Sequence, residues 1–172
     1  RAIKNSIAQI APHYTMKRQL DDYYDKFYNR MAKRFNDISA NDNAKAKEIA
    51  GWKEHVASKW DDIKVVSVDV NNGNYPNSII SGIENTIIAK LDTAGLDNSI
   101  GVEMVVISTD EDGKECVYNV TPFKLIGHEN NLSIYKLVNT IDNAGSFKIA
   151  FRIFPKNNEI PHRQDFCYVK WF

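Results

Sequence analysis

The sequence predicts an α+β chain, in which an N-terminal helical hairpin precedes an antiparallel, immunoglobulin-like β-sandwich of about seven strands. Two observations indicate this order. Up to residue 62 the apolar residues recur with helical spacing, and from residue 63 they alternate or run together between Gly, Asn and Asp clusters. The charge balance also changes, because residues 1–64 hold 13 of the 22 basic and 9 of the 22 acidic residues. We therefore predict a helical segment over 1–62 and a β-sandwich over 63–172.

The helical segment contains a long amphipathic stretch. Pro12 ends a short first helix, and Thr15 is a suitable N-cap for the next one. A polar break at 39–43 separates that helix from another over 43–60, and the two are expected to pair as an antiparallel hairpin. On a wheel of ~100° per residue, the apolar residues of the first long helix fill a ring-rich arc of ~140°. This aromatic face consists of Met16, Leu20, Tyr23, Tyr24, Phe27, Tyr28, Met31 and Phe35.

The second part contains short apolar runs that predict strands, with turn residues between them. Asp112 and Gly113 form one such turn signal, typical of a hairpin. Trp52 and Trp60, on the helix that precedes these runs, are expected to lie in the core. The predicted strands cover 63–70, 86–92, 100–109, 115–126, 132–138, 146–154 and 166–172.

Composition and charge exclude several classes of function. The formal net charge is zero, and acidic residues flank the aromatic face, which argues against nucleic acid binding. No run approaches the roughly 18 apolar residues of a membrane span, and no secretory signal precedes the helices, so we predict no membrane partner and a cytoplasmic location. The four histidines lack the spacing of metal ligands. The chain begins with Arg1 instead of Met, which indicates a piece of a longer protein.

The aromatic face needs a partner. Filling a core is the ordinary role of such rings, but the arc is wider than one partner helix covers. We therefore expect further protein to contact it. The sandwich, a second copy of the chain and protein upstream of Arg1 all remain open as that partner.

A specific pattern covers the segment NSIAQIAPHYTMKRQLDDYYDKFY, residues 5–28. It resembles the end of the catalytic region in bacterial α-glucan (glycogen) phosphorylases, which reads Ser-Ile…Ala-Pro-x-Phe/Tyr-Thr/Ser-x-x-Arg-Met…Tyr…Tyr-Tyr. Here Gln19 replaces the usual Met. Residues 145–166 are similar to the closing Gly-x-Tyr/Phe…Arg-Val-x-Pro segment of a β-rich extension in some members. The matching positions of the first segment are Ser6, Ile7, Ala11, Pro12, Tyr14, Thr15, Arg18, Tyr23, Tyr24 and Tyr28.

The resemblance implies a parent enzyme with two Rossmann-like lobes and pyridoxal phosphate, which transfers glucosyl units between α-1,4-glucan and phosphate. The family's Gly-rich Asn-Met-Lys cofactor segment has no counterpart here, because Met16-Lys17 lacks the glycines, and no GxGxxG loop occurs. We therefore predict no catalytic, cofactor-binding or metal-binding residue in this chain, which should be inactive alone. In the parent the aromatic face would dock on the catalytic lobes, and the isolated chain is expected to self-associate through it.

Two other functions stay open. The sandwich is a candidate α-glucan-binding module, since exposed rings stack on sugars, and the candidate contacts are Tyr75, Tyr118, Tyr135 and Trp171. The other alternative is a free-standing protein-interaction adaptor.

Overall fold

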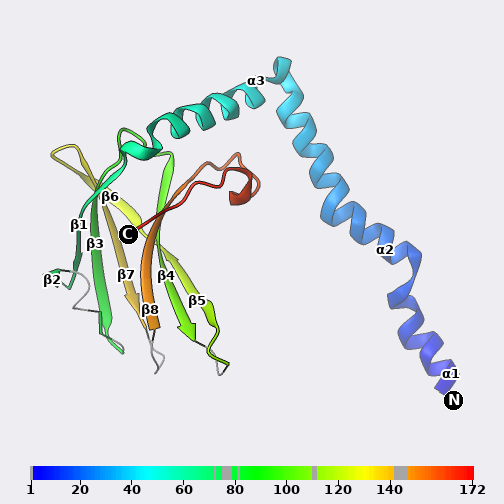
Figure 1. The fold of residues 1–172 in the computed structure, drawn as a ribbon. Helices are drawn as coiled ribbons and strands as arrows, with labels where there is room; N and C mark the ends of the chain where they lie inside the picture. Colours follow the sequence, from blue (N-terminus) through cyan, green and yellow to red (C-terminus); the bar gives the residue numbers. More distant parts are fainter. Residues whose placement is uncertain (1, 72, 75–78, 81, 110–111, 142–146) are drawn as a thin grey trace. The chain divides into compact units, whose positions relative to one another are not determined.

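The computed structural model describes residues 2–71, 73–74, 79–80, 82–109, 112–141 and 147–172 (Figure 1). Helices precede strands along the chain, which confirms the predicted α+β class. The chain divides into two compact units, residues 1–51 and 52–172. The predicted boundary at residue 62 coincides with the end of the last helical turn, η4 (Trp60–Asp62), whereas the contacts group residues 52–62 with the sandwich. The two units are called the helical unit and the sandwich unit below.

The helical unit is a series of helical segments with different hydrogen-bond repeats. Thr15 is the N-cap of α2, because its Oγ1 accepts a hydrogen bond from the backbone N–H of Arg18 at 3.2 Å, as predicted. Among the described residues no helix is both long enough and apolar enough to cross a membrane. In order, the segments are α1 (Ala2–Asn5), the π-helical η1 (Ser6–Ile10), the 3-10 helix η2 (Ala11–Tyr14), α2 (Met16–Tyr23), the π-helical η3 (Tyr24–Tyr28) and α3 (Asn29–Lys59).

The predicted helical hairpin is replaced by one helix with a kink. The backbone of α3 leaves helical geometry at Ala40, and then Asn41, Asp42 and Asn43 have φ values of 50°, 55° and 58°. Asn and Asp enter this left-handed region more readily than other residues with a side chain. The polar break was therefore correctly located. The pairing was wrong because the apolar face after the kink is used elsewhere, with Val56 buried in the core of the sandwich unit.

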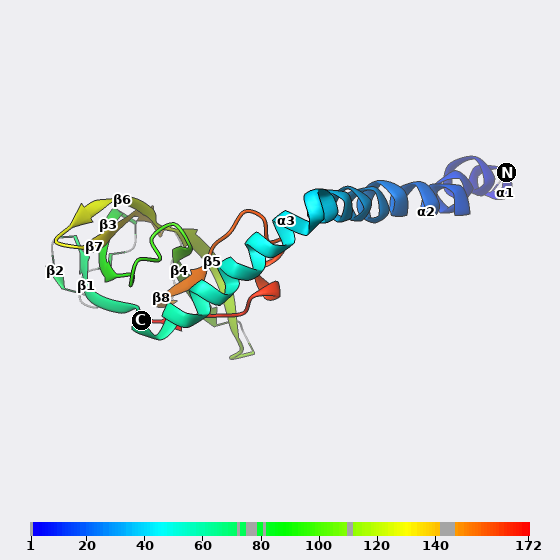
Figure 2. The same cartoon turned by 90° about the horizontal axis from the view of Figure 1, so that it is seen from above.

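The sandwich unit consists of two antiparallel sheets (Figures 1 and 2). The order is β2-β1-β3-β7-β6 in the first sheet and β5-β4-β8-β9 in the second. Within the described residues, all strand pairs of these sheets are antiparallel. The bounds are β1 (Lys64–Val70), β2 (Gly73–Asn74), β3 (Glu84–Asp92), β4 (Ile100–Thr109), β5 (Glu115–Pro122), β6 (Lys124–Glu129), β7 (Leu132–Thr140), β8 (Phe147–Pro155) and β9 (Lys170–Trp171).

The core lies between the two sheets and continues to the end of α3. Alternate residues point inward along the central strands, as the period of two in the sequence predicts. Trp60 is buried in this core, and Trp52 packs against it, which confirms the core role predicted for both rings. The strand residues of the core include Ile87, Ala89 and Leu91 of β3, Ile100, Val102, Met104 and Val106 of β4, Tyr135 and Leu137 of β7, and Phe151 and Ile153 of β8.

Two predicted strands differ from the structure. The run at 115–126 divides into β5 and β6, which belong to different sheets. Pro122 ends the first ladder because it has no N–H to donate, and the buried Phe123 then bonds by its N–H to the Val102 carbonyl at 2.8 Å. The run at 166–172 contributes only Lys170 and Trp171 to a strand. Three other rings follow the short 3-10 helix η5 (Arg163–Asp165). Phe166 packs on Trp52 of α3, Tyr168 on Trp60 of η4, and Phe172 on Phe151 of β8.

The C-terminal segment holds the end of α3 on the sandwich. The Lys170 ammonium donates to the carbonyls of Trp60 (3.3 Å), Asp61 (3.3 Å) and Ile63 (2.8 Å). A cation is favourable at a helix C-terminus because the last carbonyls there have no helical partner. Residues 52–62 are thereby fixed by contacts to residues more than a hundred positions away.

Candidate functional site

The aromatic face is exposed along its whole length. All eight of its side chains are between 43% and 69% exposed in the structure. Exposed contiguous apolar patches on soluble proteins usually mark sites of protein or ligand contact, whereas single exposed rings are common. The helical unit therefore carries an apolar surface that its own segments do not cover.

A π-helical turn organises the rings of this face. In η3 the helix widens by one residue, so that Tyr23 contacts both Phe27, with ring centroids 5.7 Å apart, and Tyr28, at 6.1 Å. Tyr24 packs edge-on against Tyr28 at 5.5 Å. An ideal wheel with a fixed angle per residue cannot show this arrangement. π-turns occur often at functional sites, which agrees with a role for the cluster in contact with a partner.

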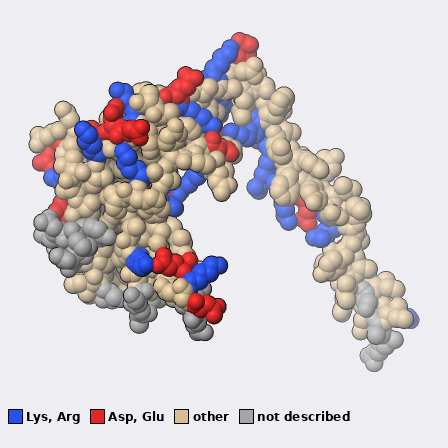
Figure 3. Space-filling view, viewed as in Figure 1, with Lys and Arg blue, Asp and Glu red and all other residues tan. Residues whose placement is uncertain are grey.

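Charged residues beside the aromatic face are paired along the helix. Arg18 bonds Asp22 at 2.8 Å, and Lys33 bonds Asp37 at 2.9 Å. In the view of Figure 3, many Lys and Arg side chains of the helical unit gather along one side of α2 and the first part of α3. Exposed pairs of this kind add little stability, but they balance charge at the rim of the rings. The surface therefore suits an apolar partner with a polar border.

The four rings predicted as sugar contacts are not brought together. Tyr135 is 3% exposed, so its ring cannot stack on a ligand, and Tyr75 lies outside the described residues. Tyr118 and Trp171 are both exposed, but they belong to β5 and β9, at opposite edges of the same sheet. Three strand spacings of about 4.8 Å separate those edges. No shared platform of described rings results from these positions.

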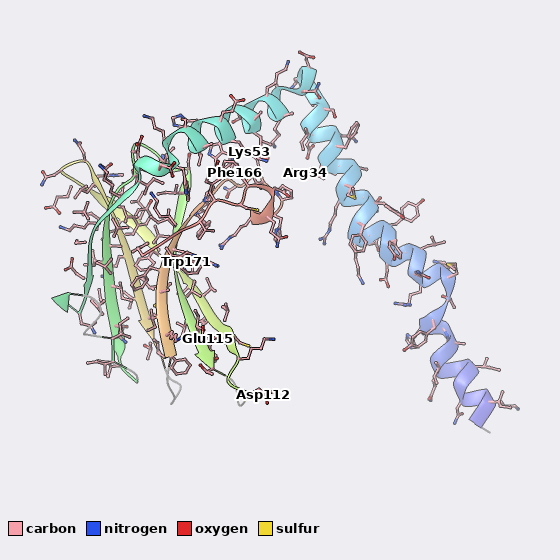
Figure 4. All side chains as sticks on the ribbon, viewed as in Figure 1. Arg34, Lys53, Asp112, Glu115, Phe166 and Trp171 are labelled. Carbon is pink, nitrogen blue, oxygen red and sulfur yellow. The ribbon has the colours of Figure 1, made fainter. Side chains whose placement is uncertain are left out.

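A groove of about 780 Å³ lies at one end of the sandwich unit, within the size range of small-ligand pockets. Its walls come from the loop between β3 and β4 and from the loop after β8. Phe166 is one of the lining residues, and the Lys53 ammonium is 5.6 Å from its ring centroid (Figure 4). The residues used below are Trp52, Asn98, Phe123, Asn157, Asn158 and Arg163, all of which line the groove.

Beside the groove, Glu103 forms the centre of a buried ion-pair cluster. Its carboxylate is 1% exposed and accepts from Arg152 Nε at 2.5 Å and from Arg163 Nη1 at 2.8 and 2.9 Å. The Arg163 guanidinium also lies 3.9 Å from the centroid of Phe154. That ring rests on Gly101, where an added Cβ would come within 2.4 Å of it. Arg163 therefore connects the segment after β8 to the outer face of β4.

A second polar cluster surrounds Asp97. Its Oδ1 accepts hydrogen bonds from Thr93 and Ser133, and the Ser133 hydroxyl lies 3.4 Å from His128 Nδ1. Burial tends to raise the pKa of Asp97, but the two hydroxyl bonds, the His128 charge and a backbone hydrogen bond together hold the pKa below its ordinary value. Burial, with the nearby Asp97 charge, raises the pKa of Tyr135 to about 12.

The Asp97 cluster does not have the order of a hydrolytic triad. In a triad, histidine lies between the carboxylate and the hydroxyl, so that it can take the hydroxyl proton. Here the hydroxyl of Ser133 lies between Asp97 and His128, and it donates to the carboxylate. We conclude that this cluster fixes the β3–β4 loop and does not activate a nucleophile.

Sequence reasoning missed Glu103 and Asp97. A signal for Glu103 was present, because it is the one charged residue in the apolar run IGVEMVVIST at 100–109. A charge inside a buried strand requires a partner, so the run itself indicated a basic residue nearby. Asp97 had no comparable signal, since it lies among loop residues.

The two-sheet domain with a helix held at its end has a counterpart among known families. Residues 60–172 match the family model described as the glycogen phosphorylase C-terminal domain. The match covers more than half of the chain, so the chain belongs to this family. This finding confirms the resemblance seen in the sequence.

One curated relative extends beyond that domain. Maltodextrin phosphorylase from Thermococcus litoralis (strain ATCC 51850 / DSM 5473 / JCM 8560 / NS-C) is 24% identical over 175 residues. The alignment covers 98% of this chain and 20% of the relative, so the chain spans about one fifth of that protein's length. No solved structure matches the chain at a significant level.

Proposed function

We propose that this chain is the noncatalytic C-terminal part of an α-1,4-glucan phosphorylase, and that its aromatic face docks the sandwich domain onto the catalytic lobes. The observation that supports this proposal most is the position of the face. It lies within the alignment to maltodextrin phosphorylase but before residue 60, where the match to the C-terminal domain begins. A surface in that position would join the C-terminal domain to the protein that precedes it.

The energetics favour a protein partner for this face. Complete burial of one Phe or Tyr side chain contributes roughly 1.5 to 3 kcal/mol. The exposed cluster of Tyr23, Tyr24, Phe27 and Tyr28 thus offers several large anchors in one place. Tyr side chains are enriched among residues that dominate binding energy at interfaces, so this cluster suits a protein contact.

Catalysis and the cofactor belong to the rest of the proposed enzyme. Pyridoxal phosphate would supply its phosphate group as acid and base there. Lys17, which follows Met16, does not fit a cofactor site, because its exposed ammonium bonds Asp21 at 2.6 Å on the first turn of α2. A cytoplasmic location is part of the same proposal.

The docking proposal can be tested by hydrogen exchange. We expect residues 16–35 to exchange much more slowly in the full-length phosphorylase than in the isolated 172-residue chain, because the lobes cover them. Phe27→Glu in the full-length enzyme should remove this protection, since it places a charge in the contact. Asn36→Glu adds the same charge at another exposed position of α3 and should leave the protection unchanged. Equal exchange in the full-length enzyme and the isolated chain would refute docking.

The isolated chain should instead associate with itself. Its rings remain exposed, and a second copy can cover them. Sedimentation velocity should therefore show dimers or larger species at micromolar concentration, and a Phe27→Glu, Met31→Glu variant should shift the chain to monomer. A stable monomer of the unmodified chain at all concentrations would contradict this expectation.

We also propose that the sandwich is of immunoglobulin-like type. The order β1-β3-β7-β6 corresponds to strands A-B-E-D, and β5-β4-β8-β9 corresponds to C′-C-F-G. This correspondence supports a shared topology. An experimental structure with β6 paired to the second sheet would contradict it.

A further inference from the structure

We propose that the groove at the end of the sandwich unit binds a neutral oligosaccharide. The proposal goes beyond docking, because none of the groove residues belongs to the aromatic face. It also moves the candidate sugar site away from Tyr118 and Trp171, the two exposed rings at the sheet edges.

The walls of the groove are formed by the fold before any ligand arrives. The two loops that face each other are tied together by a backbone bond from Lys156 N–H to the Ser99 carbonyl at 2.8 Å. The second loop is braced by Asn157, whose Oδ1 accepts from the Glu159 N–H at 2.8 Å. Trp52 Nε1 donates to Ser99 Oγ at 3.0 Å and fixes the end of the helix beside the first loop. A preformed site loses less conformational freedom on binding.

The rim carries amide groups that the protein itself leaves available. Asn98 and Asn158 are exposed, and their side chains bond to no residue within the described part of the chain. They project from the two opposite loops. An amide both donates and accepts hydrogen bonds, as a sugar hydroxyl does, so each can pair with a hydroxyl in either role.

The floor of the groove is apolar. Val102, Phe123 and Phe154 line it, and the tip of the Phe154 ring lies against Gly101. Trp52 and Phe166 add ring surface at one side, with centroids 5.4 Å apart. The C–H faces of pyranose rings can cover such a floor while their hydroxyl groups reach the amides at the rim.

The charges of the groove favour a neutral ligand. Lys156 and Arg163 provide positive charge at the lining, and Asp97 and Glu159 provide negative charge. Arg163 is already engaged with Glu103, at 2.8 Å. With both signs present in equal number, neither a phosphorylated nor a cationic ligand gains a net attraction. Hydroxyl groups are therefore the best match to the available side chains.

Calorimetric titration of the 172-residue chain with maltoheptaose and, separately, cellohexaose tests the proposal. We expect saturable binding of at least one of these saccharides. Asn98→Ala and Asn158→Ala should each weaken binding about three- to tenfold, since each removes hydrogen bonds to the ligand. Asn119→Ala removes an exposed amide on β5, outside the groove, and should bind as the unmodified chain does. Thermal unfolding would verify that the three variants are folded.

Several results would overturn the proposal. They are the absence of heat at millimolar concentrations of both saccharides, unchanged affinity in both groove variants, and a loss of affinity in Asn119→Ala. Amide chemical shifts give a second readout, and they should move at 96–101 and 156–160; movement confined to β5 and β9 would also refute the groove. None of these substitutions touches residues 16–35, so failure here would leave the docking proposal intact.

Discussion

Glu103→Gln should destabilise the sandwich unit although Gln has nearly the same shape. Glu103 lies within β4, where its buried carboxylate accepts one hydrogen bond from Arg152 and two from Arg163. Gln retains one oxygen and replaces the other by an NH₂ group. That NH₂ group would face the Arg163 guanidinium, which can only donate. One hydrogen bond from Arg163 is therefore lost. The remaining hydrogen bonds become weaker, because their acceptor is no longer charged.

The expected loss is about 2 to 3 kcal/mol of unfolding free energy. A hydrogen bond to a charged group contributes about 1.5 to 3 kcal/mol, against about 0.5 to 1.5 kcal/mol for a neutral one. Breaking a fully buried ion pair costs about 3 to 5 kcal/mol, but Arg152 and Arg163 are 26% and 56% exposed at their side chains and can turn to water. Because both arginines can regain contact with water, we expect about 2 to 3 kcal/mol and not the 3 to 5 kcal/mol of a fully buried pair.

Urea unfolding followed by tryptophan fluorescence measures this loss directly. In thermal unfolding of the same variant, the melting temperature should fall by about 6 to 9 °C, since 1 kcal/mol corresponds to roughly 3 °C for a chain of this size. Glu115→Gln is the matched control, because Glu115 pairs with Lys148 on the exposed part of β5 (Figure 4) and should change stability by less than about 0.5 kcal/mol. A double-mutant cycle with Arg163→Gln isolates the pair. Equal effects of the two glutamate substitutions would refute the reasoning.

Two further predictions concern the neighbourhood of the groove. Gly101→Ala places a Cβ 2.4 Å from the Phe154 ring and should lower the free energy of unfolding by about 1 to 3 kcal/mol in the same urea assay. Gly127→Ala is the control and should be near neutral, because within the described part of the chain its added Cβ would meet no atom within 4 Å apart from its chain neighbours. Similar losses in the two variants would contradict the close approach of Phe154 to Gly101. Because the folded-state pKa of Asp97 is lowered, its contribution is complete above the ordinary value of 3.8 and is lost as the pH falls through the folded value. Asp97→Asn should therefore flatten the acid limb of stability measured between about pH 5 and pH 2, and an unchanged slope would refute this.

Patterns with a clear period gave the correct class for most of the chain. The apolar runs located β3 and β7, and the structure shows the alternation of buried residues that a half-buried strand needs. The division between β5 and β6 was missed, since the apolar run continues through Pro122 and Phe123 while the chain changes sheets. A lone proline in such a run was the available indication.

The sites were less predictable than the strands, for a physical reason. The aromatic face was found because it depends on local spacing, whereas its π-turn depends on hydrogen bonds that spacing does not encode. The groove joins residues from five separate parts of the chain, including Trp52, Asn98 and Asn157. No local pattern shows that such residues meet. Likewise, Tyr135 was a candidate ring because it is an aromatic residue of the sandwich, and alternation could not show that it faces inward.

The bond from Lys170 to the Trp60 carbonyl has a consequence for how the domain acquires its structure. These residues are 110 positions apart, so the bond can form only after the intervening strands have assembled. Long-range closures of this kind slow folding, typically to milliseconds or seconds for β-rich domains. The backbone amides in the final turns of α3 should accordingly be the last to gain protection from exchange in a pulse-labelling refolding experiment. Until the two sheets have formed, a helix in this region lacks the contacts that fix it.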